Sequence, residues 1–444
     1  MQRIRHRLQK LSPAERSLLF VIGLALVLRL VSIVILPSTI SDDSPWYLDR
    51  GARMMTGVIT TDEVITFAPL YAMLAGTVNH LLGQDSALLF LRLVQAGLGT
   101  ATSALVWRIA YGLTRDWRVA TIAGLGIALN PIFIIDDNNI VTEPLFVFLL
   151  VWAFALYLTT TGAKRSLIGS GALFGLATLT RAMTLLFPVG LGIHLLLTVA
   201  PWKRALRAAA LLLAVYALVL SVWTLYSQVK WNKFVIGASG ISDFLLTGTL
   251  GYNGSVQVDQ QFQQLNNGTI PDGSARDPIA VGVVGSAITS NPLGYLENQG
   301  KKLLDALLQP HETPYFAGPS LKAMASDWLH NDRSLAGLGR LAGGVFFWPK
   351  LALYIAHYLA LLFGALGILL TLREWRKYAP LSGFVLYTLL LHLFLLVIPR
   401  YLFPIQPVLW VFAGVALVKV WDWLHRQQAE PRQTQPNRGE VFSS

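Results

Sequence analysis

The sequence predicts an all-α polytopic membrane protein with about ten transmembrane helices, and three observations support this prediction. Hydrophobic residues make up 54% of the 444 residues and charged residues only 13%, a balance that excludes an ordinary soluble globular protein. The apolar residues form runs of about 20, the length of a helix across the hydrocarbon layer. The formal net charge of +11 comes from short Lys and Arg clusters between these runs, which is typical of a membrane protein and excludes a nucleic-acid partner.

The first predicted span covers residues 17–36 and follows the basic stretch RIRHRLQK. This run has full span length and no A-x-A cleavage site follows it, so we interpret it as an uncleaved anchor. The absence of cysteine excludes disulfides and thiolate metal sites.

Further runs of sufficient length are 88–113, 119–135, 142–160, 167–180, 183–200, 206–228, 345–372, 381–398 and 402–421. The runs 167–180 and 183–200 form one apolar stretch in which Arg181 is the only charged residue, so we expect a tight hairpin there. The apolar segment 69–82 is too short to cross at about 1.5 Å per residue, and we place it outside. Counting it as a span would invert every later loop.

Charge sets the orientation of the predicted spans. With 69–82 outside, the basic clusters between spans all fall on the cytoplasmic side with the N-terminus, as the positive-inside rule requires: Arg115, Arg118, Lys164, Arg165, Lys203, Arg204, Arg207, Arg373, Arg376 and Lys377. Both termini are then cytoplasmic in the cell inner (plasma) membrane. The segment SDDSPWY (41–47), the turn 136–143 and a long loop over 230–350 are extracytoplasmic.

Four regions follow from this topology. Residues 1–228 form an N-terminal transmembrane module, 229–345 an extracytoplasmic loop region, 346–425 the C-terminal transmembrane helices and 426–444 a polar, disordered cytoplasmic tail. We expect a helix near 292–308 within the loop region. The region is large enough to cap a site, although no repeat or strand-rich pattern indicates a separately folding domain.

Charged residues gather at the predicted external rim: Asp42, Asp43, Arg50, Arg53, Asp136, Asp137, Glu143, Arg181 and Arg400. Charges near the hydrocarbon boundary are costly, so we expect them to face one another or a wet cavity. A carboxylate can accept a proton while a guanidinium binds phosphate oxygens. The rim therefore suits a reaction in which a carboxylate accepts a proton while guanidinium groups hold an anionic phosphate.

Simpler interpretations apply to some polar residues. A single charge at a helix end is more often a solvated cap or interfacial anchor, and Asp136 and Asp137 fit that interpretation. Arg29 lies inside the first span, where we expect a structural role such as snorkelling or pairing within the bundle.

Histidines give no compact metal-ligand motif. We interpret four polar residues of the long loop as solvent-exposed: His311, Glu312, His330 and Asp332. His357 and His392 lie within predicted spans, where they can hydrogen-bond between helices, and we rank them below the carboxylates as site candidates.

Five motifs occur in order along the chain: DSPWY, FAPLYAMLAG, LxxALNP leading to TEPLF, GLATLTRA, and IPRYLFPIQPVL. Together they resemble the bacterial branch of the GT-C glycosyltransferases, which includes lipid A aminoarabinose transferases and relatives of the protein O-mannosyltransferases. The resemblance covers 17–421 and implies a GT-C-like fold with a juxtamembrane first external loop. It also implies transfer of a sugar from a polyprenyl-phosphate-linked donor to a lipid, glycan or protein acceptor, usually with inversion, on the outer face of the cytoplasmic membrane.

The resemblance assigns roles to two carboxylates. Asp43 lies four residues before Tyr47, as in the family's first external loop, and is expected to act as general base on the acceptor hydroxyl or to orient it. Asp42 is the alternative to Asp43. Glu143 of TEPLF matches the second family carboxylate and is expected to support the acceptor or hold the sugar hydroxyls.

The resemblance also implies a cationic phosphate site. Arg400 and Tyr401 match the family's positive position near the carrier phosphate, and Arg181 of LTRA matches a position that is usually basic. Arg400, helped by Arg181 and Arg53, is expected to stabilise the charge on the departing phosphate. Many relatives have Lys or His where this chain has Phe67 and Ala68, so one phosphate contact is expected to move, for example to Arg53. A second departure, WTLYSQVKWNKF in place of WxxRN after the run 206–228, bears on acceptor or sugar specificity more than on the reaction class.

Three further alternatives follow from the residues. The scheme requires no metal cofactor, although Asp42, Asp43 and Glu143 are a set that could bind a divalent ion. The main rival function is a transporter or flippase of a lipid-linked glycan. Such proteins commonly contain an internal repeat with matching Gly or Pro breaks, and this sequence shows none. A polysaccharide polymerase or ligase would lack the first-loop Asp.

Overall fold

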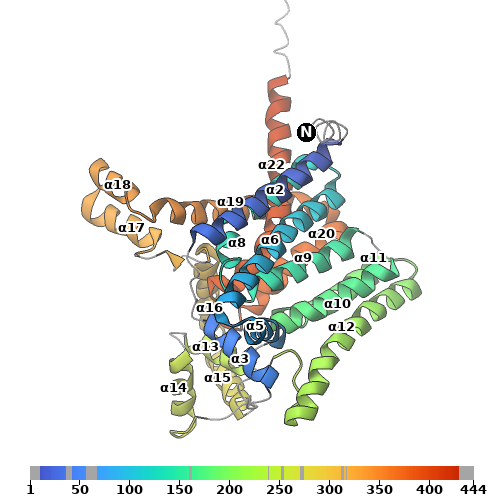
Figure 1. Cartoon of the computed structure of the whole chain (residues 1–444), viewed down its shortest axis with the longest axis vertical. Coiled ribbons are helices and arrows are strands. Elements are labelled where there is room, and N and C mark those ends of the chain that lie inside the picture. The colour runs from blue at the N-terminus through green and yellow to red at the C-terminus, as the bar shows by residue number, and fades with distance from the viewer. Residues whose placement is uncertain are drawn as a thin grey trace, which may run out of the picture.

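The computed structural model describes residues 11–36, 43–56, 68–159, 163–238, 240–251, 255–270, 275–311, 315–316 and 318–429. Within these ranges the chain is helical and contains no strand (Figure 1). Asp42, Phe67 and Glu312 lie outside the described residues. The all-α fold class expected from composition is therefore confirmed for the described part of the chain.

Seven helices in the described part of residues 11–231 pack into one bundle: α2 (Pro13–Ile35), α6 (Gln84–Thr114), α7 (Trp117–Ala128), α9 (Glu143–Thr159), α10 (Lys164–Thr180), α11 (Phe187–Thr198) and α12 (Trp202–Trp231). α2 begins with a capping box between Ser12 and Glu15 and with proline at its first position. α6 packs on α2, α7 and α9, and α10 packs between α9 and α12. Small residues permit the close approach, since a Cβ on Gly171 would come within 2.6 Å of Leu212 O.

The C-terminal helices pack against this bundle. They are α19 (Phe347–Thr371), α20 (Trp375–Leu391), α21 (Pro399–Leu402) and α22 (Gln406–Ala429). α22 packs along α19 and α7, and a Cβ on Gly367 would overlap the backbone of Phe412. The apolar part of the segment Pro399–Arg426 is 89% buried, so α22 lies inside the fold.

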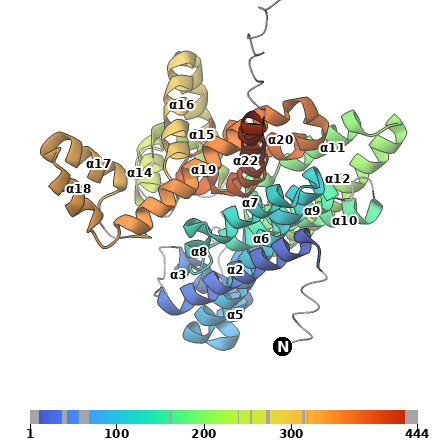
Figure 2. The ribbon, with the colours of Figure 1, turned by 90° about the horizontal axis from the view of Figure 1, so that it is seen from above.

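Two short helices pair at the end of the bundle from which α9 starts. α3 (Ser44–Thr56) and α5 (Pro69–Leu82) lie side by side below α2 and α6 (Figures 1 and 2). Gly51 and Gly76 form their contact, and a Cβ on either glycine would overlap the backbone of the other helix. With 14 residues, α5 is too short to cross a bilayer, in agreement with the sequence-based expectation.

The long loop region is also helical. It contains α13 (Ile241–Leu250), α14 (Ser255–Leu265), α15 (Arg276–Ser290), α16 (Pro292–Leu308), α17 (Leu321–Asp327) and α18 (Leu335–Ala342). α16 confirms the helix expected near 292–308. α17 and α18 project from the start of α19, as the left side of Figure 1 shows.

Five helices among the described residues are long and apolar enough to cross a membrane: Pro13–Ile35, Gln84–Thr114, Trp202–Trp231, Phe347–Leu391 and Pro399–Arg426. The pair α15 and α16, bent by 114°, makes a sixth if it is one span. These helices fit a multi-pass membrane protein, while the ten-span count stays a prediction.

The predicted span 119–135 is interrupted in the structure. Pro131 lacks a backbone N–H and begins a new short helix, α8 (Pro131–Asp136), whose N-terminus is capped by the Asn130 side chain. Hydropathy alone does not reveal this break, because both sides of it are apolar.

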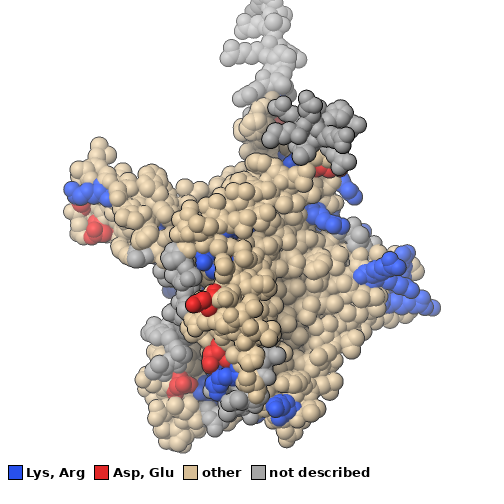
Figure 3. Space-filling view, in the orientation of Figure 1, with Lys and Arg blue, Asp and Glu red and all other residues tan. Residues whose placement is uncertain are grey.

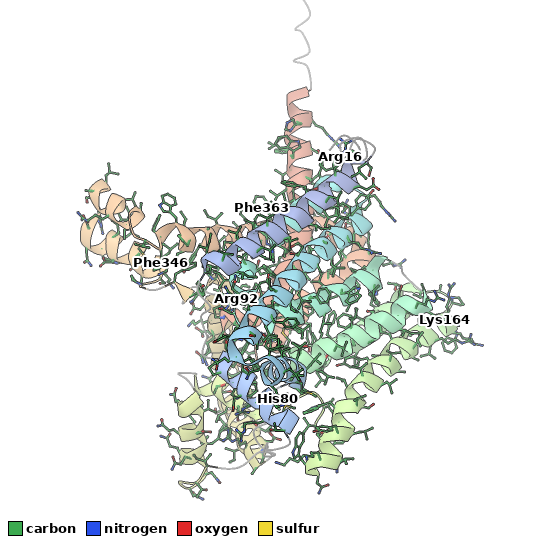
Figure 4. All side chains as sticks on the ribbon, viewed as in Figure 1. Arg16, His80, Arg92, Lys164, Phe346 and Phe363 are labelled. Carbon is green, nitrogen blue, oxygen red and sulfur yellow. The ribbon has the colours of Figure 1, made fainter. Side chains whose placement is uncertain are left out.

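Basic residues mark one end of the bundle. Lys164 begins α10 at the right side of Figure 4, and Figure 3 shows Lys and Arg gathered at the same edge. Arg181 lies at the other end of α10. The predicted cytoplasmic cluster and the predicted site residue are thus separated by the length of one helix.

Candidate active site

Four charged residues from distant parts of the chain form one ion-pair cluster. Arg400 contacts Asp43 through Nη1 and Glu143 through Nε, and its Nη2 donates to Glu143 Oε2 at 3.1 Å. Arg181 Nη1 contacts Glu143 Oε1. The structure therefore brings together four of the nine charged residues that the sequence predicted at the external rim.

Each of these side chains lies at a helix end. The Asp43 carbonyl accepts the first hydrogen bond of α3, from Tyr47 N at 3.1 Å, and Glu143 is the first residue of α9. A carboxylate is favoured at a helix N-terminus by the helix dipole. Arg181 ends α10 with an extended backbone, and Arg400 follows Pro399 at the start of α21. The fold thus collects four helix termini around one point.

Burial distinguishes the two carboxylates. Glu143 is 0% exposed, whereas the Asp43 side chain is 43% exposed. A fully buried carboxylate is strongly destabilising unless cations and hydrogen bonds compensate its charge, and Arg181 and Arg400 provide that compensation. Glu143 is therefore the inner anchor of the cluster, and Asp43 is its solvent-accessible edge.

Tyr47 lies on α3, four residues after Asp43. Its ring is buried and meets the ring of Tyr71 edge to face, with centroids 5.1 Å apart. Burial raises the pKa of Tyr47 well above its usual value, although Arg400 opposes the shift. The phenol consequently stays neutral at physiological pH and can donate a hydrogen bond.

Tyr401 lies beside the cationic half of the cluster. The guanidinium carbon of Arg181 is 5.3 Å from the centroid of the Tyr401 ring. This distance permits a cation–π contact. Tyr401 therefore contacts Arg181 through its ring and directly follows Arg400 in the sequence.

Arg53 lies further along α3 than Asp43. The ion pair described for Arg53 is with Asp49 on the same helix, at 3.7 Å. Arg53 is ten residues beyond Asp43, so the rise of α3 carries it about 15 Å along the helix axis. The phosphate role of Arg53 therefore stays a prediction. Asp42, the alternative to Asp43, is outside the described residues.

Asp136 and Asp137 are not solvated caps, contrary to the sequence-based interpretation. They are 1% and 4% exposed, and Asp137 Oδ2 lies 2.5 Å from Arg29 Nε. Burial raises the pKa of Asp137 to about 6, with Arg29 opposing the shift. The expected structural role of Arg29 inside the bundle is confirmed by this pair. The burial of these two aspartates could not be predicted, because the sequence does not reveal that other helices cover the turn 136–142.

A buried polar network holds the turn that precedes Glu143. Gln95 Nε2 donates to Asp137 O at 3.1 Å and to Asn139 O at 2.7 Å, and Gln95 Oε1 accepts a hydrogen bond from Tyr71 Oη at 2.6 Å. Arg92, labelled in Figure 4, donates to Asn138 Oδ1 and to the last carbonyls of α2. Arg92 and Gln95 were not among the residues expected at the site. Their position inside the apolar run 88–113 was the available signal.

The structure corrects the expectations for His311 and His392 and confirms the one for His357. His311 is 12% exposed and its Nε2 lies 3.4 Å from Asp136 Oδ1, so the expectation that it is solvent-exposed is wrong. The fold of the loop region, which sequence could not supply, places it there. His357 links helices as expected, since its Nε2 lies 2.8 Å from Leu307 O and Gln406 Nε2 donates to its Nδ1 at 3.0 Å. His392 contacts Leu396 O of its own loop instead of another helix, which corrects that expectation.

The sequence left open whether Asp42, Asp43 and Glu143 bind a divalent ion. Across the part of the chain that the structure describes, no group of three or more His, Asp or Glu side chains is arranged to hold a metal. Asp43 and Glu143 instead direct carboxylate oxygens to the guanidinium of Arg400.

Comparison with solved structures identifies the fold. No protein-family model matches the sequence, and no curated protein sequence matches it. The oligosaccharyltransferase of Archaeoglobus fulgidus, in its apo form, is similar with a TM-score of 0.52 and 15% identity over 95% of this chain and 52% of that chain. This chain therefore spans about half the length of that relative.

Two other membrane transferases are also similar. The S. cerevisiae protein O-mannosyltransferase Pmt1-Pmt2 complex matches with a TM-score of 0.42 and 17% identity over 55% of this chain and 37% of that chain. ArnT from Cupriavidus metallidurans matches with a TM-score of 0.39 and 13% identity over 94% of this chain and 80% of that chain. The similarity to the oligosaccharyltransferase shows that this chain has the GT-C fold, as the sequence motifs implied.

Proposed function

We propose that this GT-C-fold chain is a membrane glycosyltransferase that transfers a sugar from a polyprenyl-phosphate-linked donor to a lipid, glycan or protein acceptor. The observation that carries the proposal is that Arg400 contacts both Asp43 and Glu143. A solvent-accessible carboxylate therefore lies directly beside a guanidinium that can bind phosphate, which is what transfer from a phosphate-linked sugar requires.

Asp43 acts as the general base in this scheme. Its carboxylate takes the proton of the acceptor hydroxyl, and the hydroxyl oxygen attacks the anomeric carbon of the sugar. The new glycosidic bond forms as the bond between that carbon and the phosphate oxygen breaks. With 43% of its side chain exposed, Asp43 is the member of the cluster that an acceptor can reach.

Arg400 and Arg181 stabilise the leaving group. The bond breakage leaves a polyprenyl phosphate with an additional negative charge, and guanidinium groups placed in advance stabilise that charge as it develops. Both side chains are mostly buried, at 24% and 12% exposure, so water screens them weakly. Glu143 keeps the two guanidinium groups together and orients them.

Tyr47 and Tyr401 complete the binding site in this proposal. Tyr47 is on α3, one helical turn after Asp43, and its neutral phenol is suited to a hydrogen bond with a sugar hydroxyl. Tyr401 supports Arg181 through its ring. The active site lies on the extracytoplasmic side of the inner membrane, at the end of the bundle opposite the basic start of α10.

The test supplies purified protein with a panel of polyprenyl-phosphate-linked sugars and with lipid, glycan and peptide acceptors. Release of polyprenyl phosphate reports transfer to any acceptor. Asp43→Asn is expected to lower the rate about 10²- to 10⁴-fold. Asp49→Asn, at an exposed position of the same helix, is the matched control and is expected to keep the wild-type rate.

Two outcomes would overturn the proposal. Undiminished transfer by Asp43→Asn would remove the base from the scheme. Movement of a lipid-linked glycan across vesicles without formation of a glycosidic bond would identify a transporter or flippase.

A further inference from the structure

The ring of Tyr401 is held by side chains from three parts of the chain. Arg181 lies over it, at 5.3 Å from guanidinium carbon to ring centroid. The ring of His392 stacks nearly parallel to it, at 5.8 Å and 14°, and Phe244 meets it edge to face, at 5.7 Å and 75°. Tyr401 is therefore fixed by two aromatic neighbours while Arg181 rests against it.

Arg181 depends on few contacts for its position. Its backbone leaves α10 in an extended conformation, so the helix does not direct the side chain. The guanidinium is placed by the ion pair with Glu143 and by the Tyr401 ring. A cation is attracted to an aromatic face more strongly when water is excluded, and this side chain is 12% exposed. The ring consequently helps to set the direction of the remaining Arg181 N–H groups.

Phe244 belongs to α13, which is seated on the loop that leads to Arg400. The backbone N–H of Leu396 donates to Phe244 O at 2.9 Å. Gly248 lies against the same loop, where a Cβ would come within 2.8 Å of the Leu395 carbonyl carbon. The glycine allows the close approach that brings the Phe244 ring to Tyr401.

Three other external helices, α14, α15 and α16, fix the position of α13. Asp243, adjacent to Phe244, pairs with Arg276 of α15 at 3.2 Å, and Arg276 also pairs with Asp259 of α14 at 2.8 Å. Lys302 of α16 donates to Gly248 O at 2.8 Å. The position of the Phe244 ring is thus fixed by three further helices of the external region.

We propose that Phe244 is a positioning residue for Arg181 that acts through the Tyr401 ring, so that the external helices help to build the phosphate-binding half of the site. The inference rests on the proposed function, in which Arg181 and Arg400 bind the donor phosphate. Phe244 acts indirectly, because it contacts the Tyr401 ring and that ring contacts Arg181. His392 supports the same ring by stacking.

The experiment measures equilibrium binding of polyprenyl phosphate, without sugar, to the purified full chain. Phe244→Ala is expected to weaken binding about three- to tenfold, the effect of losing one aromatic contact. Phe244→Tyr keeps the ring and is expected to bind within about twofold of wild type. Leu250→Ala, which truncates a 50% exposed side chain on the same helix, is the matched control and is expected to leave binding unchanged.

A double-variant cycle separates positioning from a general structural effect. In an Arg181→Gln background, Phe244→Ala is expected to cause no further loss of binding, because the group that Phe244 positions is gone. Unchanged binding by Phe244→Ala alone, or an equal loss in both backgrounds, would overturn the inference. A wild-type chain that binds no polyprenyl phosphate would overturn the proposed function, and this inference with it.

Discussion

Arg400 contacts Asp43 through a single nitrogen, Nη1, at the solvent-accessible edge of the cluster. Two other nitrogens of the same guanidinium contact Glu143, which is fully buried and also contacts Arg181. The two carboxylates therefore hold Arg400 unequally. An incoming phosphate can replace the exposed Asp43 at Nη1 at little cost, whereas displacing Glu143 would leave a buried charge without its partner.

This inequality predicts opposite effects of one substitution on binding and on turnover. Asp43→Asn is expected to bind polyprenyl phosphate about two- to fivefold more tightly than wild type, because the phosphate no longer competes with an exposed ion pair for Arg400. Transfer is expected to fall as described above. Binding titrations and initial rates on the same preparations measure both effects, and weaker binding by Asp43→Asn would contradict the competition between Asp43 and phosphate.

Glu143→Gln is expected to destabilise the folded protein. The substitution leaves Arg181 and Arg400 in a mostly buried site without the carboxylate that compensates their charge, and breaking a buried pair costs about 3–5 kcal/mol. Thermal unfolding in detergent measures the loss as a lower midpoint temperature. A midpoint equal to that of wild type would show that the cluster is solvated and that Glu143 is not its anchor.

The buried pair of Arg29 and Asp137 predicts a non-additive double variant. Arg29→Met alone leaves a buried carboxylate unpaired and is expected to cost about 3–5 kcal/mol, whereas Arg29→Met combined with Asp137→Leu removes both charges and is expected to recover most of that loss. Chemical or thermal unfolding of the single and double variants gives the coupling. Additive losses would mean that the two side chains do not stabilise each other.

The meeting of Asp43, Glu143, Arg181 and Arg400 could be anticipated from the sequence. Each of them borders an apolar run on the same predicted side of the membrane, and the cost of placing charge near hydrocarbon favours mutual pairing. Hydropathy and charge place these residues at the rim together with five others, and only the resemblance to the GT-C glycosyltransferases singles out these four.

Placement by packing could not be anticipated. His311 and Phe244 reach the site because the external helices fold onto the loop before Arg400, and no periodicity in 229–345 indicates which face of which helix would do so. The burial of Asp136 and Asp137 likewise depends on helices that are distant in sequence.

The position of Arg400 leads to a prediction about metal dependence. Its guanidinium contacts a carboxylate oxygen of Asp43 and of Glu143, so it occupies the space in which a divalent ion shared by these two residues would lie. We therefore expect transfer to persist when the purified protein is treated with EDTA, and added Mg²⁺ or Mn²⁺ to leave the rate unchanged. Initial rates before and after chelation measure this, with Asp49→Asn as a control for non-specific effects of the treatment. Loss of transfer in EDTA that Mn²⁺ restores would instead require Arg400 to move away from the two carboxylates during the reaction, and would assign its charge-stabilising role to the ion.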